Sequence, residues 1–402
     1  MKGSIDSSAS WIPSPEDEML LMAALAPEGK ANDAGLAWLT NMNLTTQGEA
    51  TNRLLPLVHD RLLRDGIDHP AMAILKGVRR KVWCRNQLLF KHAAPAVQAL
   101  CQAGIDVMFL KGTALTLNYY QDYGLRPMGD FDMMVRFKDV AAAMEILREK
   151  GWEENFLMEG KFGRNILIYN HAMHFKDSSG LTLDFHWHLL PFCVNRAADS
   201  AFWNASITAK FDTVDVRVLN PADQLLHVCV HGLMWSGIPG IRWIPDSLAI
   251  LYKAPELDWN RLLLQTQEGN LLLFMRSALN YLVDRFGAPI PCDVLRAMNV
   301  LPVTSHGARE FTVLTERRSS YSTALGNHYS IPKALQVLFY TYRRIVADAK
   351  LCGYNVTVME YLCAYYCKKN VWRLFFYIFY RIGGQVSRLM NRVIMVLVHQ
   401  TP

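Results

Sequence analysis

Apolar residues recur at three- and four-residue spacing through much of the first hundred positions of this chain. The stretches 45–66 and 69–104 show this spacing most clearly, as expected of helices that bury one face. An earlier helix is predicted to begin after Ser14, a suitable N-cap that is followed by proline and then by acidic residues. Gly104 is expected to end the long helix, because glycine readily adopts the backbone conformation found just past a helix C-terminus. The N-terminal part of the chain is therefore predicted to be helical.

Between residues 105 and 190 the pattern changes to short β-like runs separated by helical segments. The predicted elements are, in order, a strand at 105–110, a helix of about three turns with Thr113 as N-cap, an alternating strand at 130–137, a helix ended by Gly151, and a hairpin at 172–190 with Asp-Ser-Ser-Gly at its turn. This order is typical of a small α+β or α/β unit with a mixed sheet.

Helical spacing returns at Pro221. The clearest predicted helical segments are 221–237, 242–254, 258–287 and 331–350. Residues 307–330 are polar and weakly patterned, which predicts a loop or a hinge. We therefore expect an N-terminal helical region at 1–95, a central core at 96–215 and a C-terminal helical region at 216–402.

The composition excludes few classes of protein. Of the 402 residues, 51% are hydrophobic and 19% are charged, which is ordinary for a globular chain. The formal net charge of +6 is compatible with a polyanionic ligand but too mild to predict nucleic-acid binding. Eight cysteines are scattered without a Cys-x-x-Cys pair, and the N-terminus lacks the apolar core of a signal peptide. These features predict a cytoplasmic protein with reduced thiols.

The C-terminal stretch 371–384 is the most apolar part of the chain, but Arg373 and Arg381 interrupt it. It is too short and too charged to predict a transmembrane helix. Arginines among aromatic residues, continued by Arg388 and Arg392, leave peripheral membrane contact open. Ordinary helix packing with a solvated basic face is the favoured interpretation.

Two aspartates, Asp130 and Asp132, stand one residue apart at the predicted central strand. Alternate strand residues project from the same face, so these carboxylates would repel one another if buried without a partner. Divalent cations remove this cost, and Mg²⁺ prefers oxygen ligands and phosphates. Asp184 in the predicted hairpin supplies a third carboxylate if its strand pairs beside the first. We expect these three residues to be catalytic and to hold two Mg²⁺ ions, with Mn²⁺ as an alternative.

A glycine turn lies upstream of the aspartates, where Lys111, Gly112 and Thr113 follow the first predicted strand. A glycine between a strand and a helix lets backbone N–H groups approach a phosphate. Lys111 and Arg126 would add positive charge. Lys111, Gly112, Thr113 and Arg126 are therefore predicted to bind the phosphates of a nucleotide. In two-metal catalysis, Asp184 would hold one ion and help deprotonate the acceptor hydroxyl.

At this point the chain resembles a known family. The pattern Leu-Lys-Gly-Thr-Ala-Leu at 110–115, the tyrosines at 119–120 and Gly-Leu-Arg-Pro-Met-Gly-Asp-Phe-Asp at 124–132 is similar to the uncharacterised bacterial nucleotidyltransferase family of the DNA polymerase β-like superfamily. The resemblance extends over about residues 15–290, and the last hundred residues match nothing. It implies an α+β polymerase β-like core, a glycine-hydroxyl phosphate turn at Gly112 and Thr113, and a metal pair at Asp130 and Asp132 with Asp184 as the third acid. Threonine stands where many superfamily members have serine, which keeps the hydroxyl.

The resemblance implies transfer of a nucleoside monophosphate from a nucleoside triphosphate to a hydroxyl of a small molecule or peptide, with nucleic acid disfavoured as a partner. Two other functions remain open. One is a non-catalytic nucleotide-binding or interaction module, and the other is a phosphotransferase that uses the same acids.

Several histidines admit other interpretations. His186 and His188 share a strand face with Asp184, and His171 and His174 lie nearby, which raises a zinc site as an alternative. We favour a pocket-lining or orienting role. His227 and His231 lie four apart on a predicted helix, and the resemblance places Arg242 and Asp246 beside His231. These residues either close the acceptor side or tie the helices together, and a structural role is favoured.

Overall fold

The computed structural model describes residues 11–26, 30–41, 52–154, 167, 170–191, 199–235, 240–315, 339–340, 342–346, 350 and 357–365. The chain divides into two compact units. The first comprises residues 1–155, 172–189 and 199–340, and the second comprises 156–171, 190–198 and 341–402. Every residue of the candidate site belongs to the first unit.

The first unit begins with helices, as the apolar spacing predicts. They are α1 (Pro15–Leu25), α2 (Lys30–Asn41), α4 (Leu55–Arg64) and the long α5 (Met72–Gln102). The Ser14 side chain accepts a hydrogen bond from the backbone N–H of Asp17, which confirms the predicted cap. Gly104 follows α5 with φ at +75°, a conformation that favours glycine, and so α5 ends as expected.

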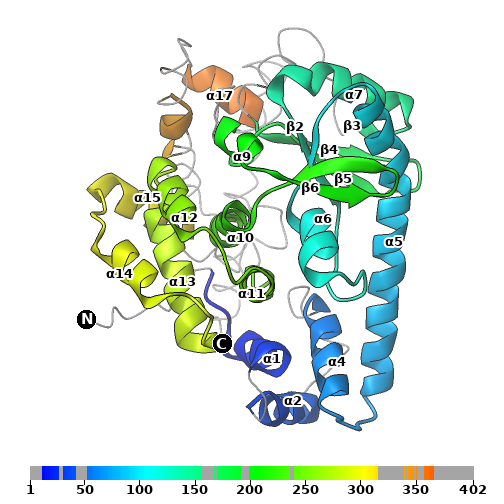
Figure 1. Cartoon of the computed structure of the whole chain (residues 1–402), viewed down its shortest axis with the longest axis vertical. Helices are drawn as coiled ribbons and strands as arrows, with labels where there is room; N and C mark the ends of the chain where they lie inside the picture. The colour runs from blue at the N-terminus through cyan, green and yellow to red at the C-terminus, as the bar shows by residue number, and fades with distance from the viewer. Residues whose placement is uncertain are drawn as a thin grey trace, which may run out of the picture. The chain divides into compact units, whose positions relative to one another are not determined.

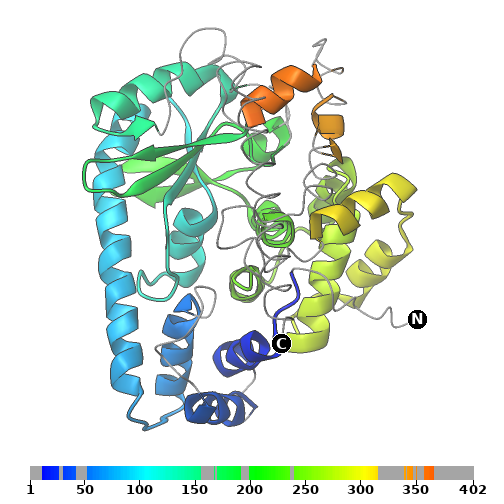
Figure 2. The ribbon, with the colours of Figure 1, turned by 180° about the vertical axis from the view of Figure 1, so that it is seen from behind.

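One mixed sheet of seven strands forms the centre of this unit, beside α5 in Figures 1 and 2. The strands are β1 (Val107–Phe109), β2 (Phe131–Val135), β3 (Glu153–Glu154), β4 (Ala172–Lys176), β5 (Thr182–His186), β6 (Ile207–Phe211) and β7 (Val214–Val218). Their order is β3-β4-β5-β2-β1-β7-β6, with β2 parallel to β5, β1 parallel to β7 and the other pairs antiparallel. The sheet and the helices around it confirm the predicted α+β class.

The two faces of β2 have different environments, as its alternating sequence predicts. Phe131 packs edge-on against Phe90 of α5 and Phe109 of β1, with ring centroids 5.4 Å and 5.1 Å apart. Asp132 points to the opposite face, where α6 (Lys111–Leu115) packs on β2. The aromatic face therefore secures the strand against α5 and leaves the carboxylate on the other side.

The predicted hairpin of β4 and β5 is present, with its turn at Asp177-Ser178-Ser179-Gly180. Asp177 Oδ1 accepts hydrogen bonds from the backbone N–H groups of Ser179 and Leu181, and Gly180 has φ at +84°. These local interactions set the register of the hairpin, in which His174 lies opposite Asp184.

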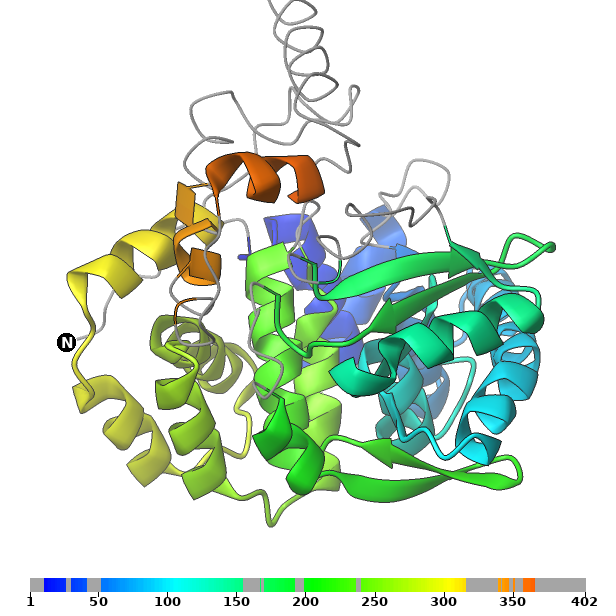
Figure 3. The same cartoon turned by 90° about the horizontal axis from the view of Figure 1, so that it is seen from above.

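The sequence analysis did not predict three of the strands, β3, β6 and β7. β6 is mostly exposed, and the sequence analysis assigned no strand to it although Ile207, Ala209 and Phe211 alternate with polar residues; it pairs with β7, which in turn pairs with β1. β3 has two residues at the other edge. The β6–β7 hairpin and strand β4 lie toward opposite edges of the sheet, as Figure 3 shows.

Helices α10 (Pro221–Trp235), α11 (Trp243–Lys253), α12 (Trp259–Glu268) and α13 (Leu272–Phe286) lie within the predicted helical segments 221–237, 242–254 and 258–287. The sequence analysis did not predict α9 (Ser200–Asn204), which precedes β6, or α14 (Cys292–Val300), which is followed by α15 (Ser305–Thr315). Helix α15 shows that the loop predicted over 307–330 was wrong for the first part of that segment. The apolar residues of α15 pack against α10 and α13, whereas its polar residues weaken the helical pattern of the sequence. The rest of that segment, and the basic and aromatic region from Arg373 to Arg392, lie outside the described residues.

The second unit contributes α17 (Val358–Tyr365) among its described residues, with the Tyr342 and Tyr361 rings 5.5 Å apart. In the described part of the chain no helix combines the length and apolarity that a membrane crossing requires. The division into regions 1–95, 96–215 and 216–402 stays a prediction.

Candidate functional site

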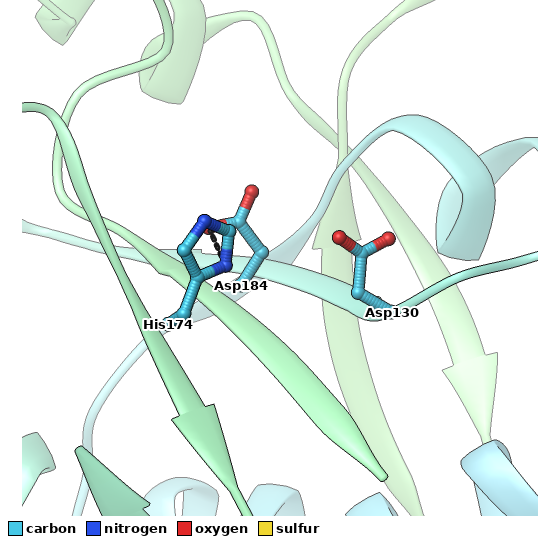
Figure 4. A group of neighbouring side chains, drawn as sticks. All are labelled: Asp130, His174 and Asp184. Atoms are coloured by element: carbon cyan, nitrogen blue, oxygen red, sulfur yellow. Dashed lines mark ion pairs between the residues drawn. The ribbon is translucent and has the colours of Figure 1, made fainter. Parts of the chain in front are cut away.

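The three predicted acids lie together on one face of the sheet. Asp132 of β2 is the register partner of Asp184 of the parallel strand β5, and Asp130 lies two residues before Asp132. Asp132 and Asp184 are buried, whereas Asp130 is half-buried at the start of the strand. Figure 4 shows the Asp130 and Asp184 carboxylates beside His174. The pairing of strands that the sequence analysis required for their convergence is thus present.

Lys111 lies against these carboxylates. Its ammonium nitrogen is 2.8 Å from Asp184 Oδ2, to which it donates a hydrogen bond, and 3.0 Å from Asp132 Oδ1. Its backbone has φ at +38°, a region that costs a lysine free energy. The sequence analysis places Lys111 on the phosphates; in the structure its charge instead compensates the buried acids.

The pKa values of the two buried acids move in opposite directions. Burial raises the pKa of Asp132 to about 7, against the lowering effect of the Lys111 charge. Burial would also raise the pKa of Asp184, but His186 and Lys111 outweigh it and hold that pKa well below its usual value. For Lys111, burial alone would lower the pKa, yet the two carboxylates raise it above its ordinary value. Without a metal ion, Asp184 therefore stays ionised beside a Lys111 that stays protonated.

His186 orients Asp184, as the favoured interpretation predicted. Its Nε2 atom lies 2.8 Å from Asp184 Oδ2 and 3.0 Å from the Lys111 ammonium nitrogen. One ring nitrogen can donate to the carboxylate or accept from the ammonium group, but it cannot do both at once. Burial lowers the pKa of His186, so the neutral ring is favoured. His188 is separate from the cluster, because its Nδ1 atom lies 2.6 Å from Asp199 Oδ2.

The donor set fits divalent metal ions. Ligand atoms of Asp132, Asp184 and His186 lie within 4.8 Å of one another, and so do those of Asp130, His174 and Asp184. Asp132 Oδ1 is buried, and its described partner is the Lys111 ammonium nitrogen, 3.0 Å away in an ion pair. A divalent ion could take the place of this ammonium group, because a carboxylate oxygen is a ligand that such ions prefer.

The glycine-hydroxyl turn is joined directly to the acids. The Thr113 hydroxyl accepts a hydrogen bond of 2.9 Å from the backbone N–H of Asp132 and is fully buried. Thr113 is not an N-cap, contrary to the prediction. Helix α6 already begins at Lys111, and Leu110, in extended conformation, occupies the N-cap position. The hydroxyl faces strand β2 instead of its own helix terminus, which a local pattern cannot reveal.

Gly112 lies against Arg126. A Cβ atom added at Gly112 would lie 2.5 Å from Arg126 Nη1, so only glycine allows this guanidinium group so close. Arg126 Nε and Nη2 donate to Asp246 Oδ1 and Oδ2 at 2.9 Å and 2.8 Å. Tyr120 also donates to Asp246 Oδ1, at 2.8 Å. The predicted phosphate-binding Arg126 thus has Nη1 beside the turn and its other nitrogens in a buried ion pair.

Tyr120 ends a short π-helical turn, η1 (Thr116–Tyr120), and Asp246 lies on α11. Arg242, also on α11, donates to the Pro127 carbonyl oxygen at 3.2 Å. Asp246 and Arg242 therefore tie α11 to the loop before β2, in agreement with the favoured structural interpretation. Burial is the main cause that lowers the pKa of Arg242 to about 10; the charges of Arg126 and Arg53 act in the same direction, and those of Asp246 and Asp130 oppose them.

Residues that the sequence analysis missed also hold this loop. Asn86 of α5 is fully buried; its side chain donates to the carbonyl oxygens of Tyr123 and Arg126 and accepts from the backbone N–H of Met128. His174, which the sequence analysis considered only within the alternative zinc site, lies 3.3 Å from Asp184 Oδ1. Its position opposite Asp184 in the predicted hairpin was the available signal.

Comparison with known proteins identifies the family to which the chain belongs. Residues 45–287, more than half of the chain, match the model of a family described as uncharacterised nucleotidyltransferase. Among solved structures, the crystal structure of an antigenic nucleotidyltransferase-like protein from Paracoccidioides brasiliensis matches at 18% identity over 53% of this chain and 94% of that chain, with a TM-score of 0.32. We draw no conclusion from a structural likeness of that size. A search among curated proteins found no match.

Proposed function

Because the chain belongs to this uncharacterised nucleotidyltransferase family, we propose that it is a metal-dependent enzyme that moves a nucleoside monophosphate from a nucleoside triphosphate to an acceptor hydroxyl. The observation that carries the proposal is the register of Asp132 opposite Asp184, with Asp130 on the same face. Three carboxylates in this arrangement fit two-metal phosphoryl chemistry. The acceptor is a small molecule or a peptide side chain.

Asp130, Asp132 and Asp184 would hold Mg²⁺ ions, with Mn²⁺ as an alternative. When bound, such ions neutralise the triphosphate and lower the pKa of the attacking hydroxyl. The acceptor oxygen forms a bond to the α-phosphorus, the bond from that phosphorus to the bridging oxygen breaks, and pyrophosphate leaves with the bonding electrons. We assign the proton of the hydroxyl to Asp132, whose pKa burial raises to about 7, in place of Asp184, whose pKa is held well below its usual value.

The triphosphate would lie along the turn at Gly112 and Thr113. Arg126 Nη1 lies beside Gly112, and Asp246 fixes the direction of that guanidinium group. Thr113 acts by holding the turn on β2 through Asp132, whereas Lys111 reaches the phosphates only after leaving the two carboxylates.

The test compares the wild-type protein with the double variant Asp130→Ala/Asp132→Ala. ATP, GTP, CTP and UTP are each offered with Mg²⁺, first in a thermal-shift assay and then with label in the α- or γ-phosphate. We expect one or more nucleotides to raise the Tm of the wild type, and cell extract added as a source of acceptors to receive the α-label while γ-label appears in pyrophosphate. The double variant should lose both effects, and undiminished transfer in that variant would refute the mechanism.

The exposed Asp106 precedes β1 and is remote from the cluster's ion pairs, so Asp106→Ala is a matched control that should behave as wild type. The label also separates the alternatives: γ-label on the acceptor indicates a phosphotransferase.

A non-catalytic nucleotide-binding module is the second candidate, and Lys111 favours it. An ammonium group between Asp132 and Asp184 can substitute for a metal ion permanently. In that case nucleotides would bind without divalent ions and no label would be transferred.

A further inference from the structure

His174 adds a nitrogen to the carboxylate cluster from a strand of its own. It lies on β4 directly opposite Asp184 of β5, so both side chains point to the same face of the sheet. Its side chain is 59% exposed, whereas the Asp184 side chain is 8% exposed. His174 is therefore open to solvent while it touches a buried acid.

The separation of the two groups suits shared metal coordination better than a direct hydrogen bond. His174 Nδ1 lies 3.3 Å from Asp184 Oδ1, which is beyond the usual range of a strong charged hydrogen bond. Two ligands at right angles on one ion, each about 2.2 Å from it, are roughly 3.1 Å apart. The Asp130 carboxylate lies within 4.8 Å of both ligand atoms, and Figure 4 shows the three side chains around one region.

Asp184 directs its two oxygens to different neighbours. Oδ2 faces Lys111 and His186, and Oδ1 faces His174. The inner group also contains the buried Asp132 Oδ1, which lies 3.0 Å from the Lys111 ammonium nitrogen. The carboxylate of Asp184 can thus bridge an inner position, lined by Asp132 and His186, and an outer position, lined by Asp130 and His174.

We propose that the outer position, formed by Asp130, His174 and Asp184, binds a first-row transition-metal ion in preference to Mg²⁺. The inference rests on the proposed function and specifies the ion that one of its two metal positions takes. Mg²⁺ is strongly hydrated and takes oxygen ligands, so an imidazole ligand contributes little to its binding. Transition-metal ions accept imidazole readily, and a site of two carboxylates and one histidine therefore selects them.

The test titrates Mn²⁺ into the full-length, nucleotide-free protein and follows bound Mn²⁺ by electron paramagnetic resonance, with electron spin echo modulation to detect a coordinated ¹⁴N nucleus. Mg²⁺ is then added in competition. We expect ¹⁴N modulation in the wild type, and about a 10-fold preference for Mn²⁺ over Mg²⁺. His174→Ala and His174→Asp should each lose the part of the modulation that comes from His174 and most of that preference, while His186 can still supply a nitrogen at the inner position.

His92→Ala is the matched control. His92 Nδ1 lies 2.7 Å from Asp177 Oδ2 at the turn of the same hairpin, so this variant perturbs the hairpin without touching the cluster. It should keep both the modulation and the metal preference.

The possible failures are distinguishable. Mn²⁺ bound without ¹⁴N modulation in the wild type, or modulation and Mn²⁺ preference that are undiminished in His174→Ala, would overturn this inference and leave the carboxylate metal site intact. Failure of the wild type to bind either ion would overturn both this inference and the metal-dependent function.

Discussion

Asp132 and Asp184 lie directly opposite one another on two parallel strands, and the Lys111 ammonium nitrogen lies 3.0 Å from the first carboxylate and 2.8 Å from the second. A buried pair of like charges is therefore held together by a cation that belongs to the chain itself. Metal binding at Asp132 and Asp184 must compete with this ammonium group, and the energetics of the site follow from that competition.

Replacing Lys111 by methionine should separate the two effects of its charge. In EDTA, Lys111→Met should lower the free energy of unfolding by about 3 kcal/mol, because the buried carboxylates lose their compensating charge. The same variant should bind Mg²⁺ or Mn²⁺ about 10-fold more tightly, because no ammonium group has to be displaced. Urea unfolding and isothermal titration calorimetry measure these quantities.

The exposed Lys138 provides the comparison. Lys138→Met should change neither quantity appreciably. Weaker metal binding by Lys111→Met would show that Lys111 assists the metal site and does not compete with it.

Gly112 should tolerate no side chain. Gly112→Ala places its Cβ 2.5 Å from Arg126 Nη1, and the bidentate pair with Asp246 prevents Arg126 from moving away. We expect a loss of about 1–3 kcal/mol in stability, as for other overpacked sites, together with weaker nucleotide binding. Gly129→Ala is matched to it, because nothing lies within 4 Å of an added Cβ there. Equal effects of the two substitutions would contradict a role for the Gly112–Arg126 approach.

The ion pair of Arg126 and Asp246 should be a major determinant of stability. Asp246→Asn leaves the buried guanidinium group uncompensated, and we expect the free energy of unfolding to fall by about 3–5 kcal/mol. Tyr120→Phe removes one neutral donor from the same carboxylate and should cost about 1 kcal/mol. Denaturant titration measures both losses, and the reverse ranking would show that the charge pair is not the main interaction at this position.

Acid should destabilise the protein partly through His59. Its side chain is 4% exposed, and burial, followed by the charge of Arg79, lowers its pKa. Below about pH 6.5 the unfolded chain then binds a proton that the folded chain does not, so stability falls as the pH decreases. His59→Gln and His59→Leu should each reduce this slope by up to ~1.4 kcal/mol per pH unit. Unfolding at pH 7.5 and 5.5 measures the slopes, and identical slopes in all three proteins would exclude His59 as a source.

Much of the site was predictable because its signals are local. The alternation through Asp130 and Asp132 depends only on strand geometry, and the hairpin that carries Asp184 is specified by Asp177 and Gly180 at its turn. The cap at Ser14 is equally local. For such features the interacting groups are a few residues apart, so residue types and spacing suffice.

Other features depend on pairs of groups far apart in the chain. Lys111 lies 73 positions before Asp184, and Arg126 lies 120 positions before Asp246. Their charges could be assigned from the sequence, but not their partners, and so both were expected to face phosphates. The β6–β7 hairpin does alternate apolar and polar residues, but its place in the sheet depends on the pairing of Met108 in β1 with Arg217 in β7, far apart in the chain.

The residue order alone thus predicted a mixed sheet among helices, the acidic strand and the hairpin, since backbone geometry and turn chemistry act over short distances. Tertiary packing decided which cation neutralises the acids, which arginine is held by Asp246 and that His174 joins the cluster. Those outcomes depend on burial and on charges brought together by the sheet, because the free energy of a buried charge depends on its neighbours in space.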